Sequence, residues 1–189
     1  MSTAALARAT IDDLLDVEGK AELISGRIVE FVPTGFLPGL VALNITFSLR
    51  ERARSLGVGV VLGDNVGFTV PELESGRQSF SPDASYYVGP LPKNAMRFIE
   101  GPPTLAVEVR SDGDYGPAAE RTMAAKRADY SEAGTLVVWD VDPLAELVHV
   151  DRADSPLIPA TYGRSQIAEA EPAVPGWRPL VDDLLPRRE

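Results

Sequence analysis

Asp83, Glu108 and Lys126 are the side chains whose types and order along the chain suggest chemistry. Two carboxylates from neighbouring strands can share a divalent cation, whose charge offsets their repulsion and makes a bound water easier to deprotonate. An ammonium group beside them can stabilise negative charge that develops on a phosphate. We therefore take these three residues as the first candidates for a catalytic site.

The position of Glu108 within a strand needs a physical reason. Residues 104–110 have the pattern of a strand, in which alternate side chains share a face, so Glu108 shares its face with Ala106 and Arg110. A carboxylate in a central strand costs several kcal/mol unless it is paired or binds a cation. Two alternatives follow, a metal ligand or an ion pair with Arg110 or another basic side chain.

Lys126 belongs to a predicted helix over residues 117–133. The 3.6-residue period places Lys126 on the apolar, inward arc and leaves Arg121, Arg127 and Asp129 outside it. The alternative is a lysine at the helix edge that extends to solvent. The members of the inward arc, besides Lys126, are Ala119, Met123, Tyr130 and Ala133.

Asp83 follows Pro82 in an extended run just after a turn. Proline is tolerated there only at the start of a strand, at an edge or at a bulge, so we expect Asp83 near a strand end. The alternative is that Ser81-Pro82-Asp83 is only a turn.

The flanking elements are predicted from periodicity and turn signals. Residues 21–24 and 27–32 form a hairpin around Ser25-Gly26, and residues 39–56 form a helix between Pro38 and Gly57. Residues 80–88 form a strand, residues 89–103 a loop, and residues 104–141 a strand-helix-strand unit at the core. The loop contains an exposed-looking apolar group, namely Met96, Phe98 and Ile99.

Length and composition limit the possible functions. The chain has 189 residues, which predicts a single domain over 1–189, and no apolar stretch or leader suggests a membrane or an address other than the cytoplasm. With no cysteine and one histidine, His149, a metal must be held mainly by oxygen, which favours magnesium, manganese or calcium. The net charge of −10 opposes binding to nucleic acid, although Arg50, Arg52 and Arg54 form a local basic cluster.

Two other enzyme classes are poorly supported. The chain has no Gly-x-Ser-x-Gly nucleophile elbow, which argues against a serine hydrolase. It also lacks the glycine-rich and Gly-Lys-Ser/Thr phosphate loops of nucleotide-binding units.

The candidate residues carry a family resemblance. Pro82-Asp83, Val107-Glu108-Val109 and Lys126 resemble the PD-(D/E)XK nuclease pattern with its lysine shifted to the next helix. Over residues 10–151 the arrangement resembles the Uma-two family of putative bacterial restriction endonucleases. The matching motifs are Ala21-Glu22-Leu23-Ile24-Ser25-Gly26-Arg27, Ser81-Pro82-Asp83, Ala106-Val107-Glu108-Val109, Lys126 with Tyr130, and Val137-Val138-Trp139-Asp140.

The resemblance implies a fold, a site and a substrate. The fold is the restriction-endonuclease-like α/β type, a mixed central β-sheet flanked by helices. Asp83 and Glu108 would hold Mg²⁺ or Mn²⁺, with Lys126 beside them to stabilise the transition state. Glu22 would be an additional acid near the site, and the alternative is an acid exposed on the hairpin. The implied partner is DNA, and a homodimer suits an enzyme that cuts two strands.

Arg110 departs from the family pattern because it occupies the place of the lysine in the unshifted motif. Three alternatives follow for Arg110: it replaces Lys126, it assists Lys126, or it pairs with Glu108 and weakens metal binding. Two functions therefore remain open. One is a Mg²⁺-dependent endonuclease that hydrolyses DNA. The other is a catalytically inactive dimer of nuclease fold that serves as a binding module, which the acidic pI near 4.6 and the apolar loop favour.

Overall fold

The computed structural model describes residues 8–155 and 159–187 and is built around a six-stranded sheet. β8 and β9 are parallel, and the other neighbouring strands are antiparallel, so the sheet is mixed. This is the predicted α/β class. The strands follow one another across the sheet in the order β11 (Ala160–Gly163), β10 (Leu147–Arg152), β9 (Val137–Asp142), β8 (Leu105–Val109), β6 (Ala84–Tyr87) and β3 (Val60–Gly63).

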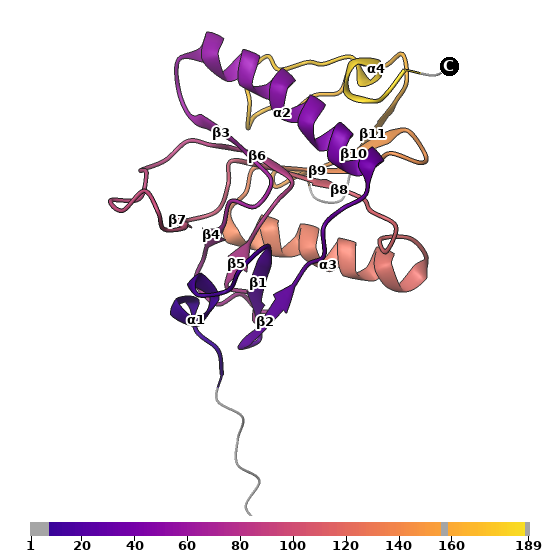
Figure 1. Ribbon diagram of the computed structural model, residues 1–189. Helices are drawn as coiled ribbons and strands as arrows, with labels where there is room; N and C mark the ends of the chain where they lie inside the picture. The colour runs from indigo at the N-terminus through magenta and orange to yellow at the C-terminus, as the bar shows by residue number, and fades with distance from the viewer. Residues whose placement is uncertain (1–7, 156–158, 188–189) are drawn as a thin grey trace, which may run out of the picture.

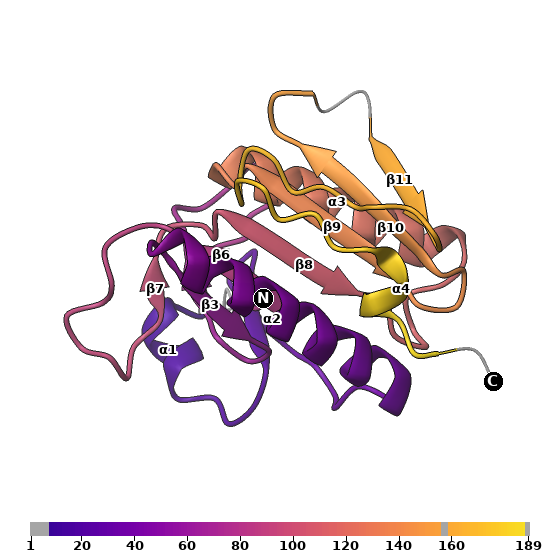
Figure 2. The same ribbon diagram turned by 90° about the horizontal axis from the view of Figure 1, so that it is seen from above.

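Helices cover both faces of this sheet (Figure 1). Helix α2 (Phe36–Leu56) packs against β3, β6 and β8 on one face and runs alongside β8 in the view from above (Figure 2), and the short α4 (Val181–Leu184) contacts it. Helix α3 (Pro117–Ala133) lies on the opposite face and connects β8 to β9. The predicted strand-helix-strand unit is therefore present at the centre of the fold.

Smaller elements gather on the α3 side of the sheet (Figure 1). Helix α1 (Ile11–Leu15) leads into the predicted hairpin of β1 (Ala21–Ile24) and β2 (Arg27–Glu30). A three-stranded sheet next to the hairpin has the order β5 (Ser79–Phe80), β4 (Phe68–Thr69) and β7 (Ile99–Glu100), and β5 contacts β1. Residues of β4, β5 and β7 pack with Tyr130 of α3 and Ala106 of β8 in a second hydrophobic cluster.

The alternation predicted for β8 is confirmed and divides the core in two. Leu105, Val107 and Val109 pack under α2, whereas Ala106 packs on the α3 side with Tyr130. Because side chains two apart share a face, Glu108 must also face α3. The sheet thus presents an apolar face to α2 and carries its buried acid toward α3.

Local sequence signals account for the element boundaries. Thr10 forms a capping box with Asp13 at the start of α1. Ser25 and Gly26 both have positive φ, 52° and 70°, as a tight hairpin turn requires. Helix α3 ends at Gly134, which is left-handed with φ of 103° and has no side chain to oppose that conformation.

Three boundaries differ from the prediction. Helix α2 begins at Phe36 instead of residue 39, because Pro38 lies in its first turn, where a missing N–H costs nothing. The strand predicted over residues 80–88 is divided by residues 81–83 into β5 and β6. The loop predicted over residues 89–103 contains β7, which buries Ile99.

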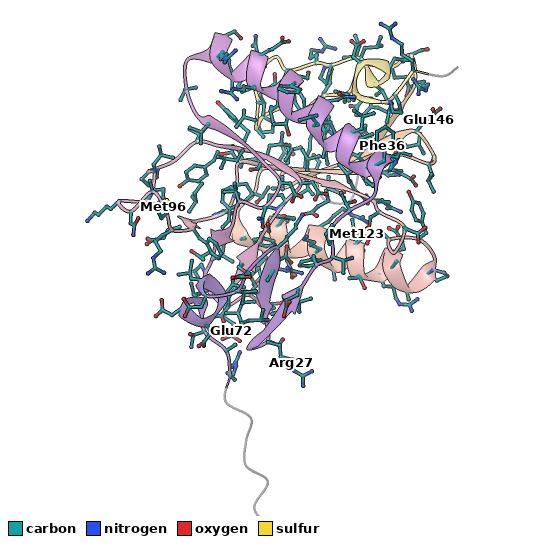
Figure 3. All side chains as sticks on the ribbon, in the orientation of Figure 1. Arg27, Phe36, Glu72, Met96, Met123 and Glu146 are labelled. Carbon is teal, nitrogen blue, oxygen red and sulfur yellow. The ribbon has the colours of Figure 1, made fainter. Side chains whose placement is uncertain are left out.

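The prediction that Met96, Phe98 and Ile99 form an exposed apolar surface is consequently wrong. Ile99 is buried, and the Phe98 ring packs against Gly67, which leaves Met96 alone exposed (Figure 3). Within the described parts of the chain, no helix is both long and apolar enough to cross a membrane.

The burial of α2 yields a stability prediction. Leu49 of α2 is fully buried against the sheet side of the core, whereas Leu43 on the same helix is half exposed. Leu49→Ala should lower the free energy of unfolding by about 3 kcal/mol, because it removes buried methyl groups and leaves a cavity. The matched Leu43→Ala should change it by less than about 0.5 kcal/mol. Urea denaturation checks both values, and equal losses would contradict the packing described.

Candidate metal and catalytic site

Three structural elements bring Glu22, Glu108 and Lys126 together between the sheet and α3, and Asp83 adjoins them through the backbone of β8. Glu108 comes from β8, Lys126 from α3 and Glu22 from β1, while Asp83 lies directly before β6. Met123, three residues before Lys126 on α3, is buried and is labelled in Figure 3. The inward placement predicted for Lys126 is therefore correct, and its ammonium lies among carboxylates.

Glu108 is buried, and both of its carboxylate oxygens have partners. Lys126 Nζ lies 2.9 Å from Oε2, and the Tyr130 hydroxyl donates to Oε1 at 2.6 Å. Burial raises the pKa of Glu108 to about 7, because Lys126 and Tyr130 offset the loss of hydration only in part and nearby Asp83 and Glu22 add repulsion. Glu108 therefore takes up or releases a proton near neutral pH.

Lys126 connects two buried carboxylates. Its Nζ is 3.0 Å from Glu22 Oε1 as well as 2.9 Å from Glu108 Oε2. Burial acts to lower the pKa of Lys126, but the charges of Glu108 and Glu22 outweigh it and raise the pKa above its usual value. The ammonium remains charged at neutral pH and is held in place from two sides.

Glu22 is fully buried, so the alternative of an acid exposed on the hairpin is wrong. The Arg77 guanidinium binds Oε2, while the Ser81 backbone N–H donates to Oε1 at 3.0 Å. Burial opposes ionisation, yet Lys126 and Arg77 together lower the pKa of Glu22 below its usual value. Glu22 therefore stays ionised and fixes the position of Lys126.

Asp83 adjoins this cluster through the backbone of β8. Its Oδ2 accepts a hydrogen bond of 2.7 Å from the N–H of Val109, the residue after Glu108. Its Oδ1 lies 2.6 Å from Lys20 Nζ, which is also 2.7 Å from Asp64 Oδ1. Asp83 and Glu108 are thus neighbours, each paired with its own lysine.

Sequence reasoning missed several members of the cluster. Lys20 and Arg77 were not singled out, because Lys20 precedes the hairpin and Arg77 lies in a polar stretch typical of turns. Asp129 was placed outside the inward arc of α3, which is wrong. It is buried because Arg77 Nε donates to its Oδ2 at 2.8 Å, and a partner so distant in sequence leaves no local signal.

Arg110 belongs to a separate network. Its guanidinium donates to both carboxylate oxygens of Asp140, at 2.7 and 2.6 Å, and contacts Glu120 at 2.8 Å. Arg127 of α3 binds Asp140 and Glu120 as well. Asp140 stands opposite Glu108 in the β8–β9 register. The alternative in which Arg110 pairs with Glu108 is therefore wrong, because Arg110 pairs with Asp140 and Glu120.

The charges of the Glu108 cluster do not cancel. Five carboxylates contact three cationic side chains, which leaves two negative charges when all are ionised, and a divalent cation would balance them. The carboxylates are Glu22, Asp64, Asp83, Glu108 and Asp129, and the cations are Lys20, Arg77 and Lys126.

The donor chemistry of the cluster suits a hard divalent cation. Carboxylate oxygens are the ligands that Mg²⁺ and Mn²⁺ prefer. Within residues 8–155 and 159–187, no group of three or more His, Cys, Asp or Glu side chains is arranged to hold a metal. Ammonium groups instead contact one oxygen each of Asp83 and Glu108. A cation that bound Asp83 and Glu108 would therefore have to displace both ammonium groups.

Comparison with known families identifies the same family that the sequence motifs resemble. Residues 11–185 match the model of the Uma2 family, which is described as putative restriction endonuclease. The chain belongs to this family. No curated protein sequence matches the chain.

A solved structure supports the same fold for this Uma2 protein. It is a crystal structure from Anabaena variabilis described as a putative nuclease belonging to DUF820. The two chains share 18% identity with a TM-score of 0.73, and the match covers 93% of this chain and 96% of the other. At this identity the likeness establishes the fold alone, which is that of a nuclease-type α/β protein.

The raised pKa of Glu108 predicts a pH dependence of stability. The folded protein binds the carboxyl proton of Glu108 more tightly than the unfolded chain does. The stabilisation of the folded state by this proton is therefore complete at low pH and is lost as pH rises through about 7. The free energy of unfolding of the wild type, relative to Glu108→Gln, should fall by about 1–3 kcal/mol between about pH 5 and pH 8. Urea denaturation across this range measures it, and parallel pH profiles would refute the assignment.

Proposed function

We propose that this Uma2 protein is a metal-dependent endonuclease that hydrolyses phosphodiester bonds in DNA. The observation that carries the proposal is the position of Lys126, whose ammonium lies between buried Glu22 and Glu108, the second of which also experiences the charge of Asp83. A stable protein gains little from burying two carboxylates and a lysine that could be replaced by apolar side chains. Such an arrangement is more typical of a site that acts on a charged group.

Each residue of the site has a distinct role in this proposal. Asp83 and Glu108 would hold the cation, and Glu108, whose pKa is raised to about 7, would have to lose its proton to do so. Lys126 donates to the phosphate and stabilises the charge that develops in the transition state. A bound Mg²⁺ supplies charge neutralisation of the phosphate and a more acidic water.

The surrounding side chains position these groups. Glu22 holds Lys126 at 3.0 Å, and Arg77 in turn binds Glu22 and Asp129. The Tyr130 hydroxyl fixes one oxygen of Glu108. Arg110 is a positioning residue of the adjacent Asp140 network and does not replace Lys126. Rigid support of this kind keeps the reacting groups within the narrow geometry that catalysis needs.

The acidic net charge of −10 remains an obstacle to DNA binding. Of the three arginines near the end of α2, Arg52 is engaged with the carbonyl oxygen of Pro175, while Arg50 and Arg54 are exposed. Cations bound at the carboxylates reduce the repulsion where the phosphate must approach. DNA binding should therefore depend on divalent cations more than on the basic cluster.

This proposal predicts cation-dependent cleavage of DNA. Purified protein should nick or linearise plasmid with Mg²⁺ or Mn²⁺ and should be inactive with a chelator. Asp83→Asn and Lys126→Met should each lower the rate by at least about 100-fold, because one removes a cation ligand and the other the transition-state cation. Agarose gel assays over a time course measure these rates.

A distant acid provides the control. Asp154 is exposed in the turn after β10, and Asp154→Asn changes the net charge as Asp83→Asn does but should leave the rate unchanged. Thermal melts establish that each variant is folded. The proposal fails if the folded wild type cuts neither duplex nor single-stranded DNA, or if the Asp83 and Lys126 variants cut like the wild type.

The second candidate function is a catalytically inactive homodimer that serves as a binding module. One observation favours it, an exposed apolar segment between β2 and α2. Phe36, labelled in Figure 3, is 84% exposed and Val32 is 88% exposed, while Phe31 lies with its ring centroid 5.8 Å from Lys126 Nζ. Exposed apolar surface of this kind is typical of an interface. This segment replaces the loop around Met96 as the candidate dimer contact.

Self-association through the segment is directly testable. Light scattering coupled to size-exclusion chromatography should show a wild-type dimer that Val32→Ser with Phe36→Ser converts to a monomer, because polar side chains remove the apolar contact. The control is Phe47→Ser. Phe47 is exposed on α2, the helix that begins with Phe36, and this substitution should leave the dimer intact. A wild type that is monomeric at every concentration would exclude this interface.

A further inference from the structure

Lys20 lies between two carboxylates at the edge of the site. Its Nζ is 2.6 Å from Asp83 Oδ1 and 2.7 Å from Asp64 Oδ1, and its side chain is 20% exposed. The two acids differ in their surroundings, since the Asp83 side chain is 18% exposed and that of Asp64 is 49% exposed. One ammonium thus contacts an inner and an outer carboxylate at once.

The inner carboxylate is the one that a cation needs. Oδ2 of Asp83 accepts the N–H of Val109, so Oδ1 is the oxygen without a backbone donor, and Lys20 contacts it. A divalent cation and the ammonium of Lys20 cannot both occupy the same face of this oxygen. Binding of the cation must therefore include a displacement of Lys20.

The outer carboxylate offers the displaced ammonium a partner. Asp64 Oδ1 also accepts the N–H of Asn65 at 2.7 Å, which fixes its orientation. Asp64 and Asp83 line one pocket of about 190 Å³ between α2 and β3, so there is open space at both acids. A lysine has a flexible four-carbon stem and can turn from one acid toward the other without moving the backbone.

We propose that Lys20 is a built-in counter-ion of the cation site, which occupies Asp83 in the absence of metal and moves to Asp64 alone when a divalent cation binds. Lys20 neutralises a carboxylate that would otherwise repel Glu108, and it competes with the cation for the same oxygen. Lys20 and Asp64 together set the affinity of the site. This inference rests on the proposed role of Asp83 as a cation ligand, and it adds the residues that control its occupancy.

Calorimetric titration of the full chain with Mn²⁺, in the absence of DNA, tests this competition. Lys20→Met should bind Mn²⁺ about tenfold more tightly than the wild type, because the competing ammonium is gone. Asp64→Asn should bind it at least about threefold more weakly, because the displaced ammonium loses its second partner. Lys20→Arg keeps a competing cation and should bind like the wild type within about threefold.

Lys93→Met is the matched control, because it makes the same substitution and charge change at an exposed loop position far from Asp83 in sequence. It should leave the Mn²⁺ affinity unchanged. Lys20→Met that binds no more tightly than Lys93→Met would overturn the inference. A Lys20→Met variant with a lower melting temperature but an unchanged Mn²⁺ affinity would also overturn it, because Lys20 would then only support the fold.

A double-mutant comparison separates the role of Asp64 from that of a direct ligand. If Asp64 acts through Lys20, Asp64→Asn should have no effect on Mn²⁺ affinity in the Lys20→Met background. An equal loss in both backgrounds would make Asp64 a ligand and would contradict the inference. Because the titration contains no DNA, absence of cleavage would affect the proposed function alone. Absence of Mn²⁺ binding in both the wild type and Lys20→Met would overturn the counter-ion role.

Discussion

The ion pairing of Lys126 with two buried carboxylates is the interaction on which this site depends. Glu22 and Glu108 come from segments that are distant in sequence, and each would be costly to bury alone. The ammonium lowers that cost and so fixes the distance between the hairpin, the central sheet and α3. Removal of the lysine would leave Glu108 without a cationic partner and Glu22 with Arg77 alone, in a poorly hydrated space.

The two faces of the central sheet differ in their packing, because one is apolar and the other carries the ion pairs. The face of the sheet under α2 is apolar throughout its buried core and can carry most of the stability of the fold. The face under α3 can then accommodate two charged networks, one around Glu108 and one around Asp140, whose acids are neighbours in the β8–β9 register. Arg77 links the first network to Asp129 of α3, and Arg127 of α3 links the second network to Asp140.

Local periodicity predicted the parts of the site that lie on regular elements. Alternation in β8 placed Glu108, and the helical period placed Lys126, because both patterns depend only on neighbours in sequence. Asp129 was misplaced and Lys20 was overlooked, since their positions are decided by Arg77 and by Asp83, more than 50 residues away in each case. Pairing between distant segments has no local signature. The family resemblance supplied Glu22, whose burial the hairpin pattern alone did not indicate.

The central claim is that Asp83 and Glu108 form one cation site next to Lys126. A crystal soaked with Mn²⁺ tests it most directly, because the anomalous scattering of manganese locates the ion independently of any activity. The account predicts a single strong peak in contact with a carboxylate oxygen of each residue, with Lys126 still bound to Glu22. A soaked crystal without a peak there, in which Lys20 and Lys126 keep their contacts with Asp83 and Glu108, would contradict it.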